Sequence, residues 1–125
     1  MWQRLLRKIA KPRVEEAPAY VDDQIQNFLW KMKKNEYPLH TPYTGKIYQP
    51  DKRTAAKNDG YKWRVAVYEV LQLNEDIKKL MLNNAPTLDI MKLVDEQWFL
   101  TMKDNAFIKM LEGVTSMEEI ERVLN

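Results

Sequence analysis

The chain opens with apolar and cationic positions interleaved at helical spacing. Apolar side chains recur every three or four positions, with cations between them (Trp2, Leu5, Leu6 and Ile9; Arg4, Arg7, Lys8 and Lys11). This spacing predicts a short amphipathic helix over residues 1–11, which Pro12 ends. One hypothesis for it is a peripheral membrane contact, because Trp and Leu opposite Arg and Lys are typical of interfacial helices. The other is a helix that docks on its own domain or on a partner.

The pattern then changes from a linker to a helix and to an irregular segment. Residues 12–19 hold two prolines and predict a linker. Asp22 or Asp23 can cap a helix that runs to about residue 35, because apolar residues follow at helical spacing. Residues 37–60 keep no period and predict an ordered loop or small hairpin, with 41–48 as the best strand. Aromatic and cationic residues gather there: Tyr37, Tyr43, Tyr48, Tyr61, Lys46, Lys52, Arg53, Lys57 and Lys62.

The back half combines one strand with four short helices. Residues 62–70 alternate and predict a strand. Helices follow over about 75–83, 88–98, 104–112 and from 117, with Met81 and Met91 among the residues expected to face inward. Gly113 stands where a helix C-terminus favours glycine, and Ser116 with Glu119 fits a capping box.

These elements predict an α+β fold that is mostly α. A short strand or hairpin region precedes a compact bundle of four short helices, with one or two helices before it. Residues 1–19 would form a basic segment and linker. Residues 20–125 would form one small domain, in which a helix and an aromatic, basic loop region (20–58) precede the back-half unit (59–125).

Composition excludes several kinds of site. The 125 residues include no cysteine, one histidine and three glycines. Disulfides, thiolate zinc sites and a cysteine nucleophile are therefore excluded, and His40 alone makes no tetrahedral metal site, so we expect no metal and no cofactor. No apolar run approaches the ~20 residues of a membrane span, so we expect a cytoplasmic protein. Cations prevail in residues 1–62 and acidic residues in 63–125, which indicates two segments with different surroundings.

Two runs of the back half are similar to a known family. Residues 60–71 read GYKWRVAVYEVL and residues 109–120 read KMLEGVTSMEEI. In order and spacing they resemble the Gly-Tyr-x-Gly-Arg…Tyr-Glu-x-Leu and Lys-x-x-Glu-Gly-hydrophobic-Thr-Ser/Thr-x-Glu-Glu runs of the type II secretion and type IV pilus assembly ATPases. The resemblance covers about residues 59–124, and it implies the C-terminal domain of a longer RecA-type ATPase.

The same comparison shows departures from the family. A phosphate-binding loop needs Gly-x-x-x-x-Gly-Lys-Ser/Thr. The only Gly-Lys here is Gly45-Lys46, which Ile47 follows, with His40 at the first glycine position. The family's paired Cys-x-x-Cys motifs have no counterpart in residues 52–59. Trp63 stands where the family has glycine, and residues 1–57 match no part of these ATPases that we can name.

We therefore expect a non-catalytic interaction module and not an enzyme. It would act as adaptor, regulator or competitor of a bacterial secretion or pilus motor. Its partner would be that ATPase or its inner-membrane platform, reached from the cytoplasm at the inner face of the membrane. The candidate partner-binding residues are aromatic or cationic: Trp63, Tyr37, Tyr43, Tyr48, Lys46, Arg53, Trp2, Arg4 and Arg7. The alternative is a small nucleic-acid-binding protein that uses residues 37–64, because stacking with cations suits single strands.

Overall fold

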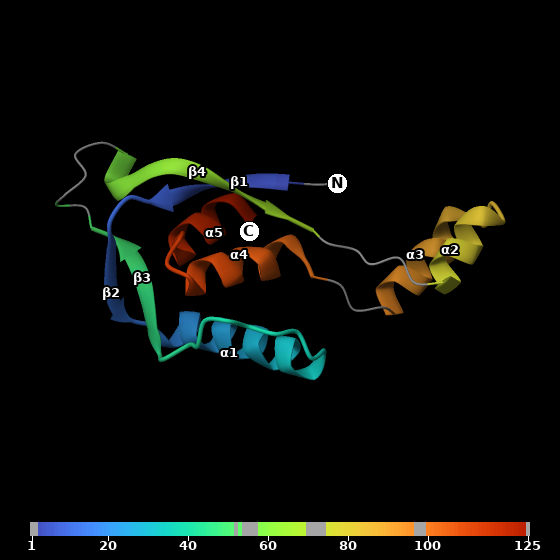
Figure 1. The fold of residues 1–125 in the computed structure, drawn as a ribbon, viewed down its shortest axis with the longest axis horizontal. Coiled ribbons are helices and arrows are strands. Elements are labelled where there is room, and N and C mark those ends of the chain that lie inside the picture. Colours follow the sequence, from blue (N-terminus) through green and yellow to red (C-terminus); the bar gives the residue numbers. More distant parts are fainter. Residues whose placement is uncertain (1–2, 52, 54–57, 70–74, 97–99, 125) are drawn as a thin grey trace.

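The computed structural model describes residues 3–51, 53, 58–69, 75–96 and 100–124. The predicted fold class, α+β and mostly α, is confirmed (Figure 1). The elements in chain order are β1 (Gln3–Ile9), β2 (Pro12–Glu16), α1 (Ala19–Lys34), β3 (Lys46–Pro50), a 3-10 turn (Asn58–Gly60), β4 (Tyr61–Tyr68), α2 (Glu75–Leu82), α3 (Thr87–Glu96), α4 (Met102–Leu111) and α5 (Met117–Leu124).

The four strands form two antiparallel two-stranded sheets, which follow each other end to end as a bent ribbon. β1 pairs antiparallel with β4, and β2 pairs antiparallel with β3. At the bend, the Ala10 N–H donates to the Gly60 carbonyl (3.0 Å) and the Asp51 N–H donates to the Lys11 carbonyl (2.9 Å). The chain crosses from β2 to β3 through α1 and a loop. In Figure 1 the ribbon and α1 surround α4 and α5 on three sides.

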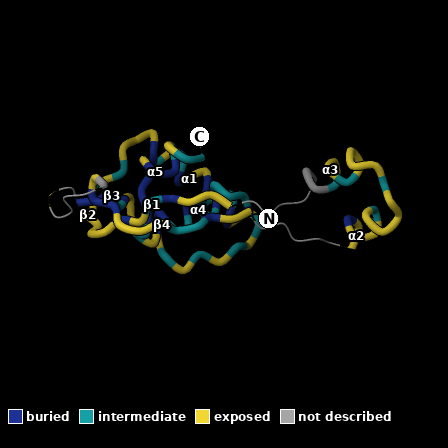
Figure 2. The backbone as a smooth tube through the Cα atoms, turned by 90° about the horizontal axis from the view of Figure 1, so that it is seen from above, coloured by how far each residue is buried: buried dark blue, intermediate teal, exposed yellow. Residues whose placement is uncertain are grey.

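The hydrophobic core fills the space inside this bend. α1 and α4 each contribute four buried apolar residues, and the rings of Phe28 and Phe107 stack with centroids 5.3 Å apart. Leu6, Ile47 and Val67 close the core from the strands. Figure 2 shows that the buried positions concentrate where the ribbon meets α1, α4 and α5. The stripes predicted for 22–35 and 104–112 are therefore core.

The two other helices of the back half form a separate pair. α2 and α3 pack against each other and lie apart from α4 and α5 (Figures 1 and 2). Met81 and Met91 are 50% and 56% exposed, so the prediction that they face inward is wrong. Leu82 and Leu88 are also more than half exposed. Among the residues that the structure describes, α3 is the main neighbour of α2, and Ile77 is the buried residue of α2.

The helix predicted over residues 1–11 is wrong for the described residues. Residues 3–9 form β1, and β2 occupies 12–16 of the predicted linker. Leu6 and Ile9 are three residues apart, as on a helix face, yet both are buried. The register shifts between Arg7 and Ile9, because β4 has one residue more than β1 there, and the alternation of β1 does not continue across this point. The interrupted alternation of β1 thus imitates helical spacing, and the described residues 3–9 do not form the predicted membrane-surface helix.

Other predictions differ from the structure mainly at element ends. α1 begins at Ala19 after Pro18, earlier than the expected aspartate cap, and β3 starts later than 41. α4 begins at Met102 because Thr101 and Asp104 form a full capping box. Gly113 follows α4 with φ +80°, as predicted, and a Cβ there would lie 3.4 Å from the Tyr48 ring.

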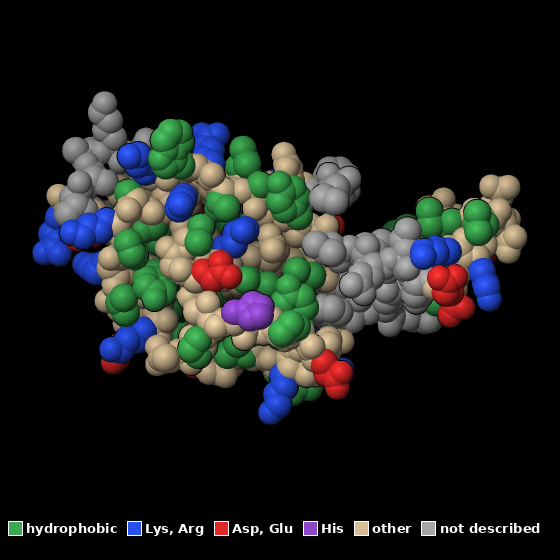
Figure 3. All heavy atoms as spheres, in the orientation of Figure 1, with side chains coloured by type: hydrophobic (Ala, Val, Ile, Leu, Met, Phe, Trp, Pro, Cys, Tyr) green, Lys and Arg blue, Asp and Glu red, His purple; other side chains and the backbone are tan. Residues whose placement is uncertain are grey.

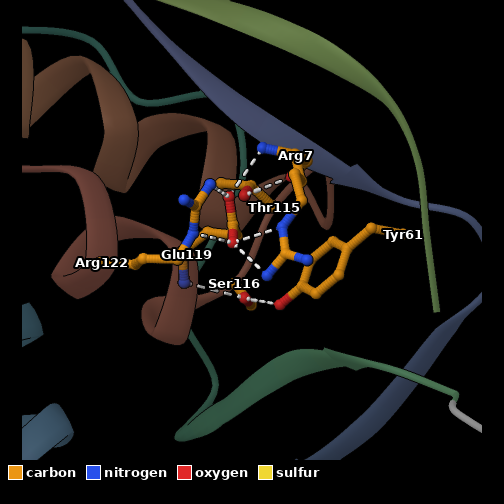
Figure 4. A network of polar contacts seen from close by, with 6 residues as sticks. All are labelled: Arg7, Tyr61, Thr115, Ser116, Glu119 and Arg122. Atoms are coloured by element: carbon orange, nitrogen blue, oxygen red, sulfur yellow. Dashed lines mark hydrogen bonds and ion pairs between the residues drawn. The ribbon is translucent and has the colours of Figure 1, made fainter. Parts of the chain in front are cut away.

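A buried carboxylate ties β1 to the last helix (Figure 4). The Glu119 side chain on α5 is 0% exposed. It accepts hydrogen bonds from the backbone N–H of Arg7 (2.8 Å) and from the Arg7 Nε (2.7 Å). The Arg122 guanidinium donates two more, at 2.8 and 3.0 Å. Both oxygens of the buried carboxylate therefore have cationic partners.

Three neighbours extend this contact to β4. The Thr115 hydroxyl donates to the Arg7 carbonyl (2.9 Å), and the Arg7 guanidinium lies 4.3 Å above the centroid of the buried Tyr61 ring. The Tyr61 and Ser116 hydroxyls share a hydrogen bond of 2.5 Å. Ser116 also accepts from the Glu119 N–H (3.3 Å), as predicted for a cap, while the Glu119 carboxylate bonds to β1. We call these six residues the Glu119 network: Arg7, Tyr61, Thr115, Ser116, Glu119 and Arg122.

The pKa of Glu119 reflects two opposed effects. Burial alone disfavours the ionised carboxylate, but hydrogen bonds from Arg122 and Arg7 outweigh it and lower the pKa from 4.5 to about 2. The folded state thus releases this proton more readily than the unfolded chain does. Its stabilising contribution is complete above pH ~4.5 and declines as the pH falls toward ~2.

Two adjacent leucines test whether residues 3–9 form a strand. Leu6 is 0% exposed and Leu5 is 47% exposed, although a helix would place both on its apolar face. We expect Leu6→Ala to lower the free energy of unfolding by ~2–5 kcal/mol and Leu5→Ala by less than ~1 kcal/mol. Urea unfolding measures both values. Equal losses would contradict the strand.

Acid titration tests the Glu119 network. We expect Glu119→Gln to lower the free energy of unfolding by ~3 kcal/mol at pH 7, because the carboxylate partner of two guanidinium groups is lost. The difference from the parent should shrink as the pH falls from 4.5 toward 2, since the parent carboxylate then loses its charge. Urea unfolding at several pH values measures it, with the exposed neighbour changed in Glu118→Gln as control. A pH-independent difference would refute the assignment.

Candidate functional site

Several of the predicted partner-binding residues have partners inside the fold. Arg7 belongs to the Glu119 network, and Arg53 pairs with Asp51 at 3.2 Å. Arg53, Lys46 and Arg4 remain exposed, and Arg4 lines an open hollow of about 420 Å³ beside α4 and α5. Trp2 lies outside the described residues. The structure therefore does not gather these cations on one surface.

The tyrosines of residues 37–48 contribute to the interior. The Tyr43 hydroxyl donates to Asp22 Oδ1 (2.6 Å). Burial, together with this hydrogen bond and the charge of Asp22, raises the pKa of Tyr43 to about 12. Tyr37 and Tyr43 pack against the core, and Tyr48 lies over Gly113. Since Tyr61 is also buried, these aromatics form no exposed stacking platform, and the arrangement gives no support to nucleic-acid binding.

Trp63 differs from these aromatic residues. It is 75% exposed and the third residue of β4, and its φ is +67° at the point where β4 has one residue more than β1. This region of backbone conformation favours glycine, the residue that the resembling ATPases have at this point. The Lys62 ammonium lies 6.0 Å from the Trp63 ring centroid. An indole thus stands in solvent at a position where the backbone does not favour it.

The strand register shows which residues share the solvent side of β1 and β4. Leu6 pairs with Val65, and Arg4 pairs with Val67. Leu6 and Val67 are buried, so these two pairs belong to the side of the sheet that faces the core. The alternate set, which includes Leu5, Arg64, Ala66 and Tyr68, therefore faces the other side, and among the described residues only Arg7 of this set turns back to the Glu119 network. We define the β1–β4 surface as the outward residues together with the adjacent indole: Leu5, Trp63, Arg64, Ala66 and Tyr68. Leu5 and Tyr68 are 47% and 38% exposed, and Arg64 is exposed as well. The surface therefore combines exposed apolar side chains with a cation.

A small hollow with a histidine lies on another side of the molecule. The loop that begins at Tyr37 and the helix α4 enclose about 270 Å³, with His40 and Glu112 among the lining residues. Figure 3 shows the histidine among hydrophobic side chains on this face. His40 is the one histidine of the chain, and no pattern of residues around it predicts this hollow.

Neither a cluster of metal-ligating side chains nor a membrane-spanning helix is present among the described residues. Within the ranges given above, no three side chains of the His, Cys, Asp or Glu type come together as a metal site. No helix in this part of the chain is both long enough and apolar enough to cross a membrane.

Comparison with known proteins gives matches along nearly the whole chain. Residues 1–122 match the family described as type II/IV secretion system protein. The type IV pilus assembly ATPase TfpB of Acinetobacter baylyi is 29% identical over 122 residues, which are 98% of this chain and 20% of that protein. The type II secretion system protein E of Xanthomonas campestris pv. campestris is 27% identical over 121 residues, 97% of this chain and 20% of that protein.

A shorter match is stronger. The type IV pilus assembly ATPase PilB of A. baylyi is 34% identical over 65 residues, 52% of this chain and 11% of that protein. The chain thus spans a fifth or less of the length of these relatives.

These matches extend the likeness seen in the sequence. The expectation that residues 1–57 have no counterpart in the ATPases is wrong, because the family match begins at residue 1. The chain therefore belongs to the type II/IV secretion system protein family.

Proposed function

We propose that this chain is a non-catalytic protein-binding module whose binding site is the β1–β4 surface, with Trp63 as the anchor. The observation that carries the proposal is the exposed indole at φ +67°. A side chain in the left-handed region costs roughly 1–2 kcal/mol. The bulge in β4 accounts for the positive φ and would favour glycine, so an exposed tryptophan at this point is kept at a cost to stability.

The surroundings of Trp63 suit a protein interface. Tryptophan, tyrosine and arginine are the residues most often found as interface anchors. Trp63, Arg64 and Tyr68 lie within one strand, and Leu5 adds apolar area from its neighbour. Exposed lysines near the rim would mainly tune the association rate and its salt dependence.

The partner we propose is a secretion or pilus motor ATPase, or the inner-membrane platform on which it acts. Family membership supports this, as do the relatives that are named type IV pilus assembly ATPases. The module would act as adaptor, regulator or competitor of the motor, in the bacterial cytoplasm at the inner face of the membrane.

The local structure at Gly45-Lys46 supports a non-catalytic role. A phosphate-binding loop leads from a strand into a helix, whose N-terminus faces the phosphates. Here Lys46 begins the strand β3, and the Ala17 N–H donates to the Gly45 carbonyl (3.0 Å). This segment therefore lacks the geometry that holds a nucleotide.

The anchor role is tested by separating stability from binding. We expect Trp63→Gly to keep the free energy of unfolding or raise it by ~1 kcal/mol, because relief of strain offsets the greater freedom of unfolded glycine. Affinity for the purified motor ATPase or platform protein should fall at least ~10-fold, measured by biolayer interferometry.

A second exposed tryptophan supplies the matched control. Trp30 on α1 is 65% exposed, far along the chain from β4. Trp30→Ala should leave binding unchanged. Undiminished binding by a folded Trp63→Gly variant would refute the proposed site.

Calorimetry tests the non-catalytic role. We expect no heat of ATP binding at micromolar affinity and no ATP hydrolysis, because no loop of the described chain can hold the phosphates. Lys46→Ala should change neither result. Saturable ATP binding that Lys46→Ala abolishes would contradict this part of the proposal.

A further inference from the structure

One edge of the β1–β4 ribbon is covered by the fold. The Arg7 N–H donates to Glu119, and the Arg7 carbonyl accepts from Thr115. The Ile9 N–H donates to the Val114 carbonyl at 2.9 Å. The side of β1 that faces away from β4 is therefore occupied from Arg7 to Ile9.

The same contacts fix which groups of β4 point outward. Arg7 is paired with Arg64, and its N–H and carbonyl point away from β4. In an antiparallel pair both residues of such a position turn their N–H and carbonyl away from each other. The backbone groups of Arg64 thus point to the free side of β4.

In an antiparallel pair, outward and inward backbone groups alternate from one residue to the next, so the groups of further β4 residues can be assigned. The pairs Leu5–Ala66 and Gln3–Tyr68 lie two and four residues further, so the Ala66 and Tyr68 groups also point outward. An independent contact agrees, because the Tyr68 N–H donates to Asn105 Oδ1 (3.2 Å) on α4. For Arg64 and Ala66, no backbone hydrogen bond to the outward side is found among the residues that the structure describes.

β4 is therefore an open sheet edge. A row of unpaired N–H and carbonyl groups is a template for another strand, and folds usually cover such edges. In Figure 1, β4 begins at the upper margin of the body and then crosses β1. Trp63 directly precedes the open position of Arg64 along the strand. The edge has a short free stretch that Asn105 closes at the Tyr68 end.

Charge identifies the kind of strand that fits. Lys62 and Arg64 on β4 are exposed, and so are Arg4 and Lys8 on β1. The acidic residue Glu69 lies after the end of β4 and is not part of the strand. A second copy would place Lys62 and Arg64 of both chains along one short ladder, where like charges destabilise pairing. Carboxylates on the incoming strand would instead meet these cations.

We infer that β4 binds an extended acidic segment of another protein as an added strand. The Arg64 and Ala66 backbones supply the ladder hydrogen bonds, Lys62 and Arg64 select carboxylates, and Trp63 packs on the apolar side chains between them. This inference rests on the proposed function for the location of the surface, and adds the chemistry of the partner and its mode of binding.

A designed peptide serves as the probe. It is acetylated and amidated, alternates Glu with Val, and is as long as β4. We expect its binding to protect the Arg64 and Ala66 amides from hydrogen exchange, measured by NMR, and to weaken with added salt. N-methylation of one alternate set of peptide amides should weaken binding at least ~10-fold, while methylation of the other set should have little effect. The same peptide with Lys in place of Glu should not bind.

A backbone variant removes one donor from the edge. Ala66→Pro deletes an outward N–H and leaves the ladder bonds of Val65 and Val67 to β1, which is the arrangement in which edge strands accept proline. Ala66→Val keeps the N–H and is the matched control. We expect the proline variant to lose peptide and partner binding while the valine variant keeps both. Circular dichroism and the exchange of core amides verify that each variant is folded.

The outcomes separate this inference from the proposed function. If Trp63→Gly weakens partner binding but a folded Ala66→Pro variant does not, the surface is correct and strand addition is wrong. If the Glu–Val peptide fails to bind, or binds without protecting Arg64 and Ala66, strand addition is also wrong. Sedimentation that shows a dimer of the parent, lost in Ala66→Pro, would assign the edge to a second copy and overturn the acidic partner.

Discussion

The Glu119 carboxylate is the contact on which the arrangement of the chain depends. Its desolvation is unfavourable, and only the hydrogen bonds from Arg7 and Arg122 offset it. A slip of β1 by one residue would turn the Arg7 N–H toward β4 and leave the carboxylate without that donor. The buried charge therefore selects one register for β1, whatever its net contribution to stability. Through Ser116 and Tyr61 the same network fixes the start of β4.

This register determines which surface the molecule presents. β1 becomes the inner strand, because α5 and the α4–α5 connection occupy its far side. β4 then becomes the outer strand, with Arg64 and Ala66 at its free edge. The internal contact of one carboxylate thus accounts for the exposure of an edge on the opposite strand. The proposed binding surface and the stability of the fold are in this way linked, although they use different residues.

The sequence predicted those elements whose signals are local. The alternation before residue 70, the α1 stripe and the glycine after α4 each depend on neighbours a few residues away, and each appears in the structure. The spacing of Ser116 and Glu119 predicts a cap, and the Glu119 N–H does donate to the Ser116 hydroxyl. The Glu119 carboxylate instead accepts from Arg7, a distant residue that no local pattern specifies. The prediction for residues 1–11 failed because the register shift after Arg7 leaves the buried Leu6 and Ile9 three residues apart, which is also the spacing of a helix face. For the candidate site, the sequence singled out Trp63 but not the buried roles of Arg7 and Tyr43, which depend on contacts with distant residues.

The pairing of the first strand with the last helix also governs when the chain can fold. Arg7 and Glu119 are 112 residues apart in the chain. During synthesis the N-terminal segment must wait until nearly all of these residues have left the ribosome before its main partner exists. Such contacts slow folding, because the entropy of closing the loop is lost before the contact forms. β4 can pair with β1 earlier, but until then the edge of β1 that later meets Glu119 and Val114 is open to other strands.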